Sequence, residues 1–315
     1  MRNLRLDENG NMITSTIAIL MVSLFLMLIF AVNTLENQNS NNIESISNDN
    51  FKSIIEDYDK TLEYNLHDSI EDLTNKVVLT RSGIHDSPKS IQKLLDEKSA
   101  KDNREFKEKY DVDIESEVLS VSSCDDPTLI EAKVKVMAEK DNEKFNSILT
   151  EKVSIEGFKD PLPFVKCGKS LSFFYLGDRI YYGLSLVEYL KLHGHIETGD
   201  GYIGASSPLT IKKCPFDPYV HHGDGLTMLK CLDKGYFHES ADGSCYLCRL
   251  EGKGTCPHYG FEVFICTVPN PEVEISISGS DHVVFHDRYP GLPLEYGLDK
   301  RLYLDTSHQK KYGII

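Results

Sequence analysis

Residues 12–32 read MITSTIAILMVSLFLMLIFAV, an apolar run without a charge, a proline or a glycine. A helix needs about 20 mostly apolar residues to span a bilayer, so this run predicts one transmembrane helix. Arg2 and Arg5 precede the run, and the next basic residue is Lys52. Because Lys and Arg near a span favour the cytoplasmic side, we expect a single-pass protein of the cell membrane. Residues 1–11 would be a short cytoplasmic head or leader, and the bulk of the chain would be extracellular.

Three interpretations of the apolar run remain open: a cleaved secretory signal, a plain signal anchor and a pilin-type leader. A cleaved signal has a shorter apolar region and a small-residue cleavage site. The polar stretch Asp7-Glu8-Asn9-Gly10-Asn11 resembles the N-termini of archaeal type IV pilin-like proteins and Tad-type pseudopilins. The resemblance implies cleavage after Gly10. Ser15 stands where such proteins commonly carry a glutamate, which favours the anchor.

Downstream of the run, apolar residues recur at steps of three or four over residues 51–77, with acidic residues between them. This spacing predicts an amphipathic helix of about 30 residues, ended by Arg81-Ser82-Gly83. The membrane helix and this helix together would form a stalk, an arrangement that resembles pilin-like proteins; the alternative is a spacer helix or a coiled coil. The positions expected on its buried face are Phe51, Ile55, Tyr58, Leu62, Leu66, Ile70, Leu73 and Val77.

The period changes to two beyond a second helix that begins at Ser87-Pro88. Apolar residues alternate with polar ones over 130–138, a turn follows at Asp141-Asn142, and residues 145–155 run back. This pattern predicts an antiparallel meander lying on the long helix. Residues 33–157 would thus form a pilin-like unit of helical stalk and antiparallel sheet. Its boundary lies near a Pro/Gly junction at 157–161.

Residues 158–315 are expected to form a loop-rich extracellular α+β domain, with strands over 261–268, 273–277 and 283–285. They contain most of the cysteines and histidines of the chain. The fold class of the whole is therefore α+β. The net charge of −15 argues against nucleic acid as a partner, because phosphates require stripes of Lys and Arg.

The cysteines allow three interpretations. Eight cysteines in an exported chain are typical of disulfides. The alternative is a structural zinc site built on a Cys-x-x-Cys pair and a later Cys-x-His pair, although that second spacing is shorter than usual. Free thiols are the third possibility, and an anaerobic host would favour zinc or free thiols. The four candidate zinc ligands are Cys245, Cys248, Cys256 and His258.

Two further groups have the residue types of a metallohydrolase site: His221, His222 and Asp224, and then Asp281 and His282 with His286 and Asp287. Neither matches a strict catalytic motif, and we expect no catalytic residues. The run 249–252 is expected to form a structural ion pair or a turn.

Several stretches resemble uncharacterised pilin-like envelope proteins of methanogenic archaea: Gly235 to Ser240, Asp242 to Cys245, Cys248 to Gly252, Ile155 to Gly157, Asp160 to Leu162, and Ser207 to Thr210. The resemblance implies a surface location and contacts with other envelope or pilin-like subunits. We therefore expect a membrane-anchored protein of surface structure or protein–protein contact. The alternatives are an extracellular ligand-binding or sensor module and a membrane-tethered metal-dependent hydrolase.

Overall fold

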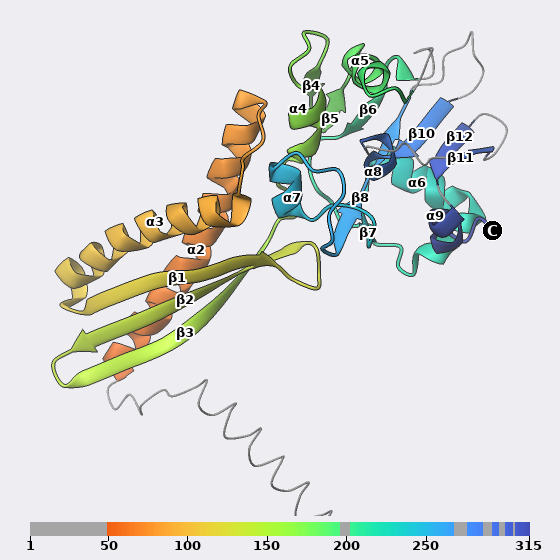
Figure 1. Ribbon diagram of the computed structural model, residues 1–315. Coiled ribbons are helices and arrows are strands. Elements are labelled where there is room, and N and C mark those ends of the chain that lie inside the picture. The colour runs from red at the N-terminus through yellow and green to blue at the C-terminus, as the bar shows by residue number, and fades with distance from the viewer. Residues whose placement is uncertain (1–48, 196–201, 268–275, 286–291, 296–299, 305) are drawn as a thin grey trace, which may run out of the picture.

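The protein is α+β, with helices packed on predominantly antiparallel sheets (Figure 1). The structure is a computed structural model and describes residues 49–195, 202–267, 276–285, 292–295, 300–304 and 306–315. None of the helices within those ranges combines the length and hydropathy that crossing a bilayer requires. The apolar run 12–32, with its head or leader, lies outside the described residues.

The long helix α2 spans Asp49–Thr80, and its predicted buried face is confirmed. All eight apolar positions, from Phe51 to Val77, are buried. Arg81 ends the helix in the left-handed region, with φ of 53°. α3 spans Ser87–Tyr110; the side chain of Asp86 caps its first turn by accepting from the Lys89 amide, which satisfies one of the free N–H groups there.

The predicted meander is confirmed as β1 (Asp113–Ser123), β2 (Leu129–Lys140) and β3 (Glu143–Ser154). Both pairs are antiparallel. Alternate residues of β2 are buried (Ile130, Ala132, Val134, Val136 and Ala138), as the period of two predicts. In Figure 1 the three strands lie along α2 and α3, so the two helices and the sheet make one helix–sheet unit over residues 49–157.

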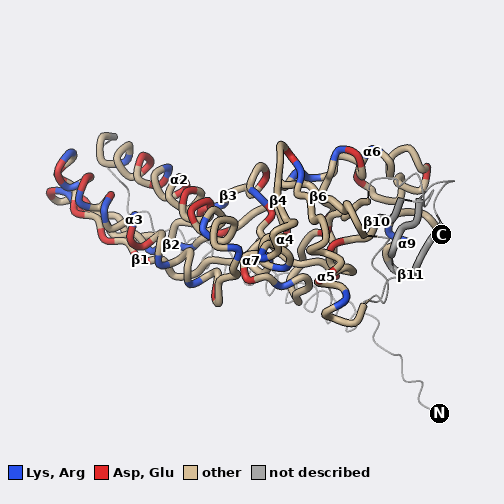
Figure 2. The backbone as a smooth tube through the Cα atoms, turned by 90° about the horizontal axis from the view of Figure 1, so that it is seen from above, with Lys and Arg blue, Asp and Glu red and all other residues tan. Residues whose placement is uncertain are grey.

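Charged residues of both signs are interspersed along α2 and α3 (Figure 2). Lys98 of α3 pairs with Asp68 and Asp72 of α2, and its Nζ lies 2.7 Å from Asp72 Oδ2. Elsewhere along the helix pair, Tyr58 OH donates to Asn103 Oδ1 at 2.6 Å. The acidic residues of α2 therefore help to hold the helix pair together at its solvated face.

The remaining residues, 158–315, are called the head here. Its longer sheet has the strand order β11-β12-β10-β9-β6-β5-β4, in which β10 and β12 are parallel and the other pairs antiparallel. These strands span Leu292–Glu295, Lys300–Leu304, Ser276–Ser280, Phe264–Cys266, Ser206–Pro208, Arg179–Tyr181 and Phe174–Leu176, in the order of the sheet.

A separate antiparallel pair joins β7 (His238–Ser240) to β8 (Gly260–Glu262). Short helices surround both sheets: α4 (Leu162–Cys167), α5 (Ser185–Leu192), the 3-10 helix η2 (Tyr219–Asp224), α6 (Leu226–Lys234), α7 (Tyr246–Leu250), α8 (Asp281–Val284) and α9 (Thr306–Lys311).

Residues 281–284 are helical, so the strand predicted over 283–285 is wrong. Asp281 Oδ1 accepts from the backbone N–H groups of His282 and Val263. This carboxylate stabilises the first turn of α8 immediately after β10 ends. Residues 283–285 are apolar, but three residues are too few to show whether their period is that of a strand or of a helix.

Helix α7 docks the head onto the helix–sheet unit. Ser87, at the start of α3, donates through Oγ to the Leu247 carbonyl at 2.8 Å. The Ile84 amide donates to the Leu250 carbonyl at 3.1 Å, and Tyr246 OH lies 2.6 Å from Thr74 Oγ1 of α2. One hydrophobic core, which includes Tyr246 and Leu250, therefore continues across the predicted boundary at residue 157.

Candidate metal centres

The four sequence-predicted ligands come together at the junction of the head and the helix–sheet unit. Cys245 immediately precedes α7, Cys248 lies within it, and the turn before β8 carries the other two. Their ligand atoms all lie within 4.8 Å of one another. We call Cys245, Cys248, Cys256 and His258 the Cys3His cluster.

Distances within the Cys3His cluster are those of a metal site. His258 Nδ1 lies 3.5 Å from Cys245 Sγ and 3.6 Å from Cys248 Sγ. Zinc–ligand bonds of 2.0–2.3 Å place the atoms of a tetrahedral set roughly 3.3–3.8 Å apart. Cys256 Sγ accepts from the Cys245 amide at 3.3 Å, which favours its thiolate form. The short Cys-x-His spacing is therefore compatible with the set.

Gly260 allows β8 to pack closely against the loop that carries Cys245. A Cβ at this position would lie 2.4 Å from the Ser244 carbonyl carbon and 2.6 Å from the Cys245 nitrogen, so only glycine lets β8 approach the loop that leads into α7. Beside the cluster lies a hollow of about 450 Å³, lined in part by Cys124, Cys248 and His258. His258 is exposed, so an ion could enter from that hollow.

A second cluster was not predicted from the sequence. It contains Cys214, His222 of η2, Cys231 of α6 and His238 of β7, and all four residues are buried. We call it the Cys2His2 cluster. Its ligands are separated by seven, eight and six intervening residues, far from the usual spacing of two to five. The one available signal was the alternation of Cys and His through a segment with few periodic runs.

The Cys2His2 cluster has the geometry of a tetrahedral site. Cys231 Sγ lies 3.4 Å from Cys214 Sγ and 3.0 Å from His222 Nε2. His222 Nε2 lies 3.0 Å from His238 Nε2. The other ring nitrogen of His222 lies 2.7 Å from the Tyr219 carbonyl, the kind of outer contact that orients a ligating imidazole. These four donors could hold one metal ion.

None of the eight cysteines, all of which lie among the described residues, forms a disulfide. The sulfur atoms of Cys214 and Cys231 are 3.4 Å apart, whereas a disulfide requires about 2.05 Å. This arrangement favours metal binding or reduced thiols over disulfides. In the Cys3His and Cys2His2 clusters, histidines lie among the sulfur atoms, so the thiols converge on shared points instead of meeting in pairs.

The thiols of each cluster shift one another's protonation. A hydrogen bond with Cys231 lowers the pKa of Cys214 to about 3, with further contributions from His222 and His238, while it raises the pKa of Cys231. Hydrogen bonds from Cys245 and Cys248 likewise lower the pKa of Cys256. Burial lowers the pKa of His238, which keeps its imidazole neutral. Thiolate and neutral imidazole are the forms that bind metal.

The predicted His/Asp groups do not assemble as the sequence suggested. His221 is exposed and separate from the Cys2His2 cluster that takes His222. Asp224 caps the start of α6 through the Thr227 amide. His282 lies with Glu262 of β8 and His308 of α9, all three buried; we call these the Glu-His-His cluster. The predicted partners His286 and Asp287 lie outside the described residues.

Arg249 forms a buried structural ion pair, as the sequence indicated. Its guanidinium donates from Nε to Asp160 Oδ1 at 2.8 Å and lies 2.6 Å from Asp281 Oδ2. All three side chains are at most 2% exposed. Burial raises the pKa of Asp281, and Arg249 opposes the shift. The triad ties α7 to the start of α4 and to α8, and so fixes the helix that carries Cys248.

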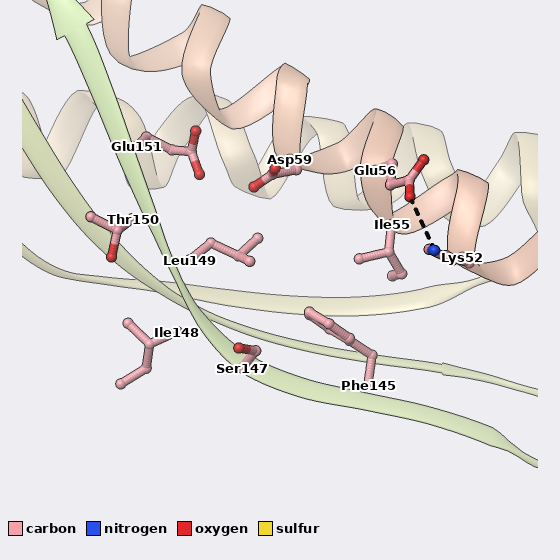
Figure 3. Close-up of a pocket in the computed structure, with 10 residues that line it drawn as sticks. All are labelled: Lys52, Ile55, Glu56, Asp59, Phe145, Ser147, Ile148, Leu149, Thr150 and Glu151. Atoms are coloured by element: carbon pink, nitrogen blue, oxygen red, sulfur yellow. Dashed lines mark ion pairs between the residues drawn. The ribbon is translucent and has the colours of Figure 1, made fainter. Parts of the chain in front are cut away.

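A groove of about 640 Å³ lies far from these clusters, between the start of α2 and β3 (Figure 3). Its described lining contains no cysteine or histidine. Glu151 and Asp59 lie on its walls, together with Lys52, Ile55, Glu56, Phe145, Ser147, Ile148, Leu149 and Thr150. Its donor set does not resemble that of the metal clusters.

Comparison of the chain with known protein families, with curated proteins and with solved structures found no match.

Proposed function

We propose that this protein is a membrane-anchored, pilin-like envelope protein that displays a zinc-stabilised head outside the cell. It would act in surface structure or in protein–protein contact. Two features support the proposal. The apolar run 12–32 has the length of a membrane span. The long helix α2 packs against an antiparallel meander, the arrangement expected of a pilin-like unit.

The main support for the proposal is that each of the two Cys/His clusters has a full set of ligands. Each supplies four protein donors. A tetrahedral ion with four protein ligands has no position left for a substrate, which is typical of structural rather than catalytic sites. Thiolate and imidazole in a tetrahedral set favour zinc over calcium or magnesium. The two ions would stabilise a head whose regular elements are too short to stand alone.

The position of the Cys3His cluster connects metal binding with the way the head is held on the helix–sheet unit. Its ligands Cys245 and Cys248 begin α7, and α7 makes the contacts with Ser87 and Thr74 that join the head to the helix–sheet unit. Zinc at this cluster would therefore fix the head on the stalk. A rigid junction suits a subunit that must present one surface to its neighbours.

The experiment labels intact cells with a membrane-impermeant, amine-reactive reagent and then identifies the N-terminus of the extracted protein by mass spectrometry. We expect labelled lysines in residues 34–315. An N-terminus at Asn11 would support the pilin-like version, whereas an intact Met1 would leave the plain anchor. Labelling only after lysis, or release of the unlabelled protein from membranes by alkaline carbonate, would contradict the proposal. A cytoplasmic protein of the same cells is the control.

A further inference from the structure

The Glu-His-His cluster gathers three buried donors from separate parts of the head. Glu262 ends β8, His282 lies in α8 and His308 lies in α9. Their exposed fractions are 0%, 3% and 2%, and one ligand atom from each lies within 4.8 Å of the other two. Burying these three groups is costly unless they have partners, so their convergence requires an explanation.

The two oxygens of Glu262 have different surroundings. Oε1 accepts from Lys311 Nζ at 2.8 Å and from Tyr312 OH at 2.5 Å. Oε2 lies 2.9 Å from His282 Nδ1 and 2.9 Å from His308 Nε2. Yet Oε2 has no hydrogen bond of acceptable geometry among the described residues. Both ring nitrogens thus lie within contact distance of this oxygen.

Short separations without hydrogen-bond geometry are expected when several lone pairs point at a common centre. In the Cys2His2 cluster, His222 Nε2 and His238 Nε2 are also only 3.0 Å apart, although that contact has hydrogen-bond geometry. Two hydroxyl groups approach the same nitrogens: Ser280 Oγ lies 3.1 Å from His282 Nδ1, and Ser240 Oγ lies 3.5 Å from His308 Nε2. The rival explanation is a metal-free ion cluster neutralised by Lys311.

The framework around these donors is shared with the Cys2His2 cluster. Glu262 and His238 are cross-strand partners in the β7–β8 pair, so their side chains lie on the same face. The Tyr312 ring packs 5.3 Å from His222 and 5.2 Å from His238, centroid to centroid, while its hydroxyl donates to Glu262. Such outer contacts preorganise metal ligands.

We propose that Glu262, His282 and His308 bind a third metal ion, a divalent transition metal, through Oε2, Nδ1 and Nε2. The site differs in kind from the two thiolate clusters, because its donors are two imidazoles and one carboxylate. Three protein donors leave at least one coordination position. A water molecule or the oxygen of a small anion would fill it. This inference goes beyond the proposed function and does not depend on it.

The test is a cobalt(II) titration of the full-length protein, stripped of metal in detergent under reducing, anaerobic conditions. We expect three equivalents to bind. Two produce thiolate-to-cobalt charge-transfer absorption, and the third adds only the weaker visible bands of a nitrogen/oxygen site. His308→Ala should bind two equivalents and keep both charge-transfer signals. Tyr312→Phe should still bind three, with the third weakened about 10- to 100-fold.

His85→Ala is the matched control, because His85 is exposed in the α2–α3 loop and should leave three equivalents bound. The wild-type count decides the question even if His308→Ala fails to fold. Saturation at two equivalents with both charge-transfer signals would overturn the third site and leave the zinc proposal standing. A third equivalent that persists in folded His308→Ala would also overturn the assignment.

Discussion

At the scale of the residue, Arg249 is the most consequential single side chain outside the metal clusters. It is fully buried between two carboxylates that have no access to water. Burial alone would lower the pKa of Arg249. The two aspartates raise it by more, so the pKa rises overall. Its role is positional: it holds α7 in place, and α7 supplies Cys248 and the contacts with the helix–sheet unit.

We expect Arg249→Met to destabilise the protein by about 3–5 kcal/mol, because it leaves Asp160 and Asp281 buried without a counter-ion. Urea unfolding, followed by circular dichroism, measures the change. Adding Asp160→Asn should recover part of the loss. Arg104→Ala, at an exposed position of α3, is the control and should change stability by less than about 0.5 kcal/mol. A similarly small effect of Arg249→Met would show that the stability of the protein does not depend on the triad.

Glu151, at the groove of Figure 3, makes the stability of the folded protein depend on pH. Burial, followed by the neighbouring carboxyls of Asp59 and Glu63, raises its pKa to about 8. The folded state therefore binds this proton more tightly than the unfolded state does. The resulting stability is complete below about pH 4, near the unfolded pKa, and is lost as pH rises through 8.

Glu151→Gln should therefore be more stable than wild type by an amount that grows from pH 5 to pH 9. The gain should reach on the order of 1–3 kcal/mol, since solvent at the groove screens part of the repulsion. Melting temperatures over this pH range provide the measurement. Glu117→Gln changes an exposed residue of β1. Its melting temperature should change with pH in the same way as that of wild type. A constant difference between Glu151→Gln and wild type would refute the pKa assignment.

At the scale of the element, what could be predicted depends on how local the signal is. The apolar period of α2 and the alternation of β2 extend over enough residues to be read directly, and both were confirmed. The strands β4 to β9 have three residues each, too few to show a period. Tertiary pairing therefore determines them.

The candidate sites divide in the same way. The Cys3His cluster uses residues from one turn and one adjacent helix, so sequence spacing found it. The Cys2His2 cluster takes its ligands from η2, α6, β7 and the loop before η2, and the Glu-His-His cluster joins β8 to α8 and α9. No short motif contains either set. Only the fold brings Glu262 near His308.

Helix α7 should lose its docking when the Cys3His cluster cannot bind metal. In Cys248→Ser we expect the amides of Ile84, Ser87 and α7 to exchange hydrogen at least about tenfold faster, equivalent to about 1.4 kcal/mol. The centre of α2 should stay protected. Hydrogen exchange with mass spectrometry measures both regions.

Cys124→Ser is the matched control for this experiment. Cys124 lines the same hollow as Cys248 but does not belong to a metal-ligand group of the described residues. Unchanged exchange at Ile84 and Ser87 in Cys248→Ser would mean that the ion does not hold the junction.

At the scale of the whole molecule, an elongated helix–sheet unit carries the head at one end (Figures 1 and 2). The head combines short elements with cysteines that form no disulfide, whereas small domains that are exported usually rely on disulfides. Metal ions bound by the thiols would serve the same structural purpose where oxidation is absent. Two ions, each held by thiolates, would therefore stabilise the head.

The most direct test is to titrate the full-length protein, purified anaerobically without chelators, with an organomercurial in the presence of a chromophoric zinc indicator. Mercurials displace only thiolate-bound metal, so the reading is independent of the Glu-His-His cluster. We predict the release of two zinc ions per chain, falling to one in Cys248→Ser and in Cys231→Ser. Release of no zinc from wild type, together with an intact mass that indicates disulfides, would contradict the account.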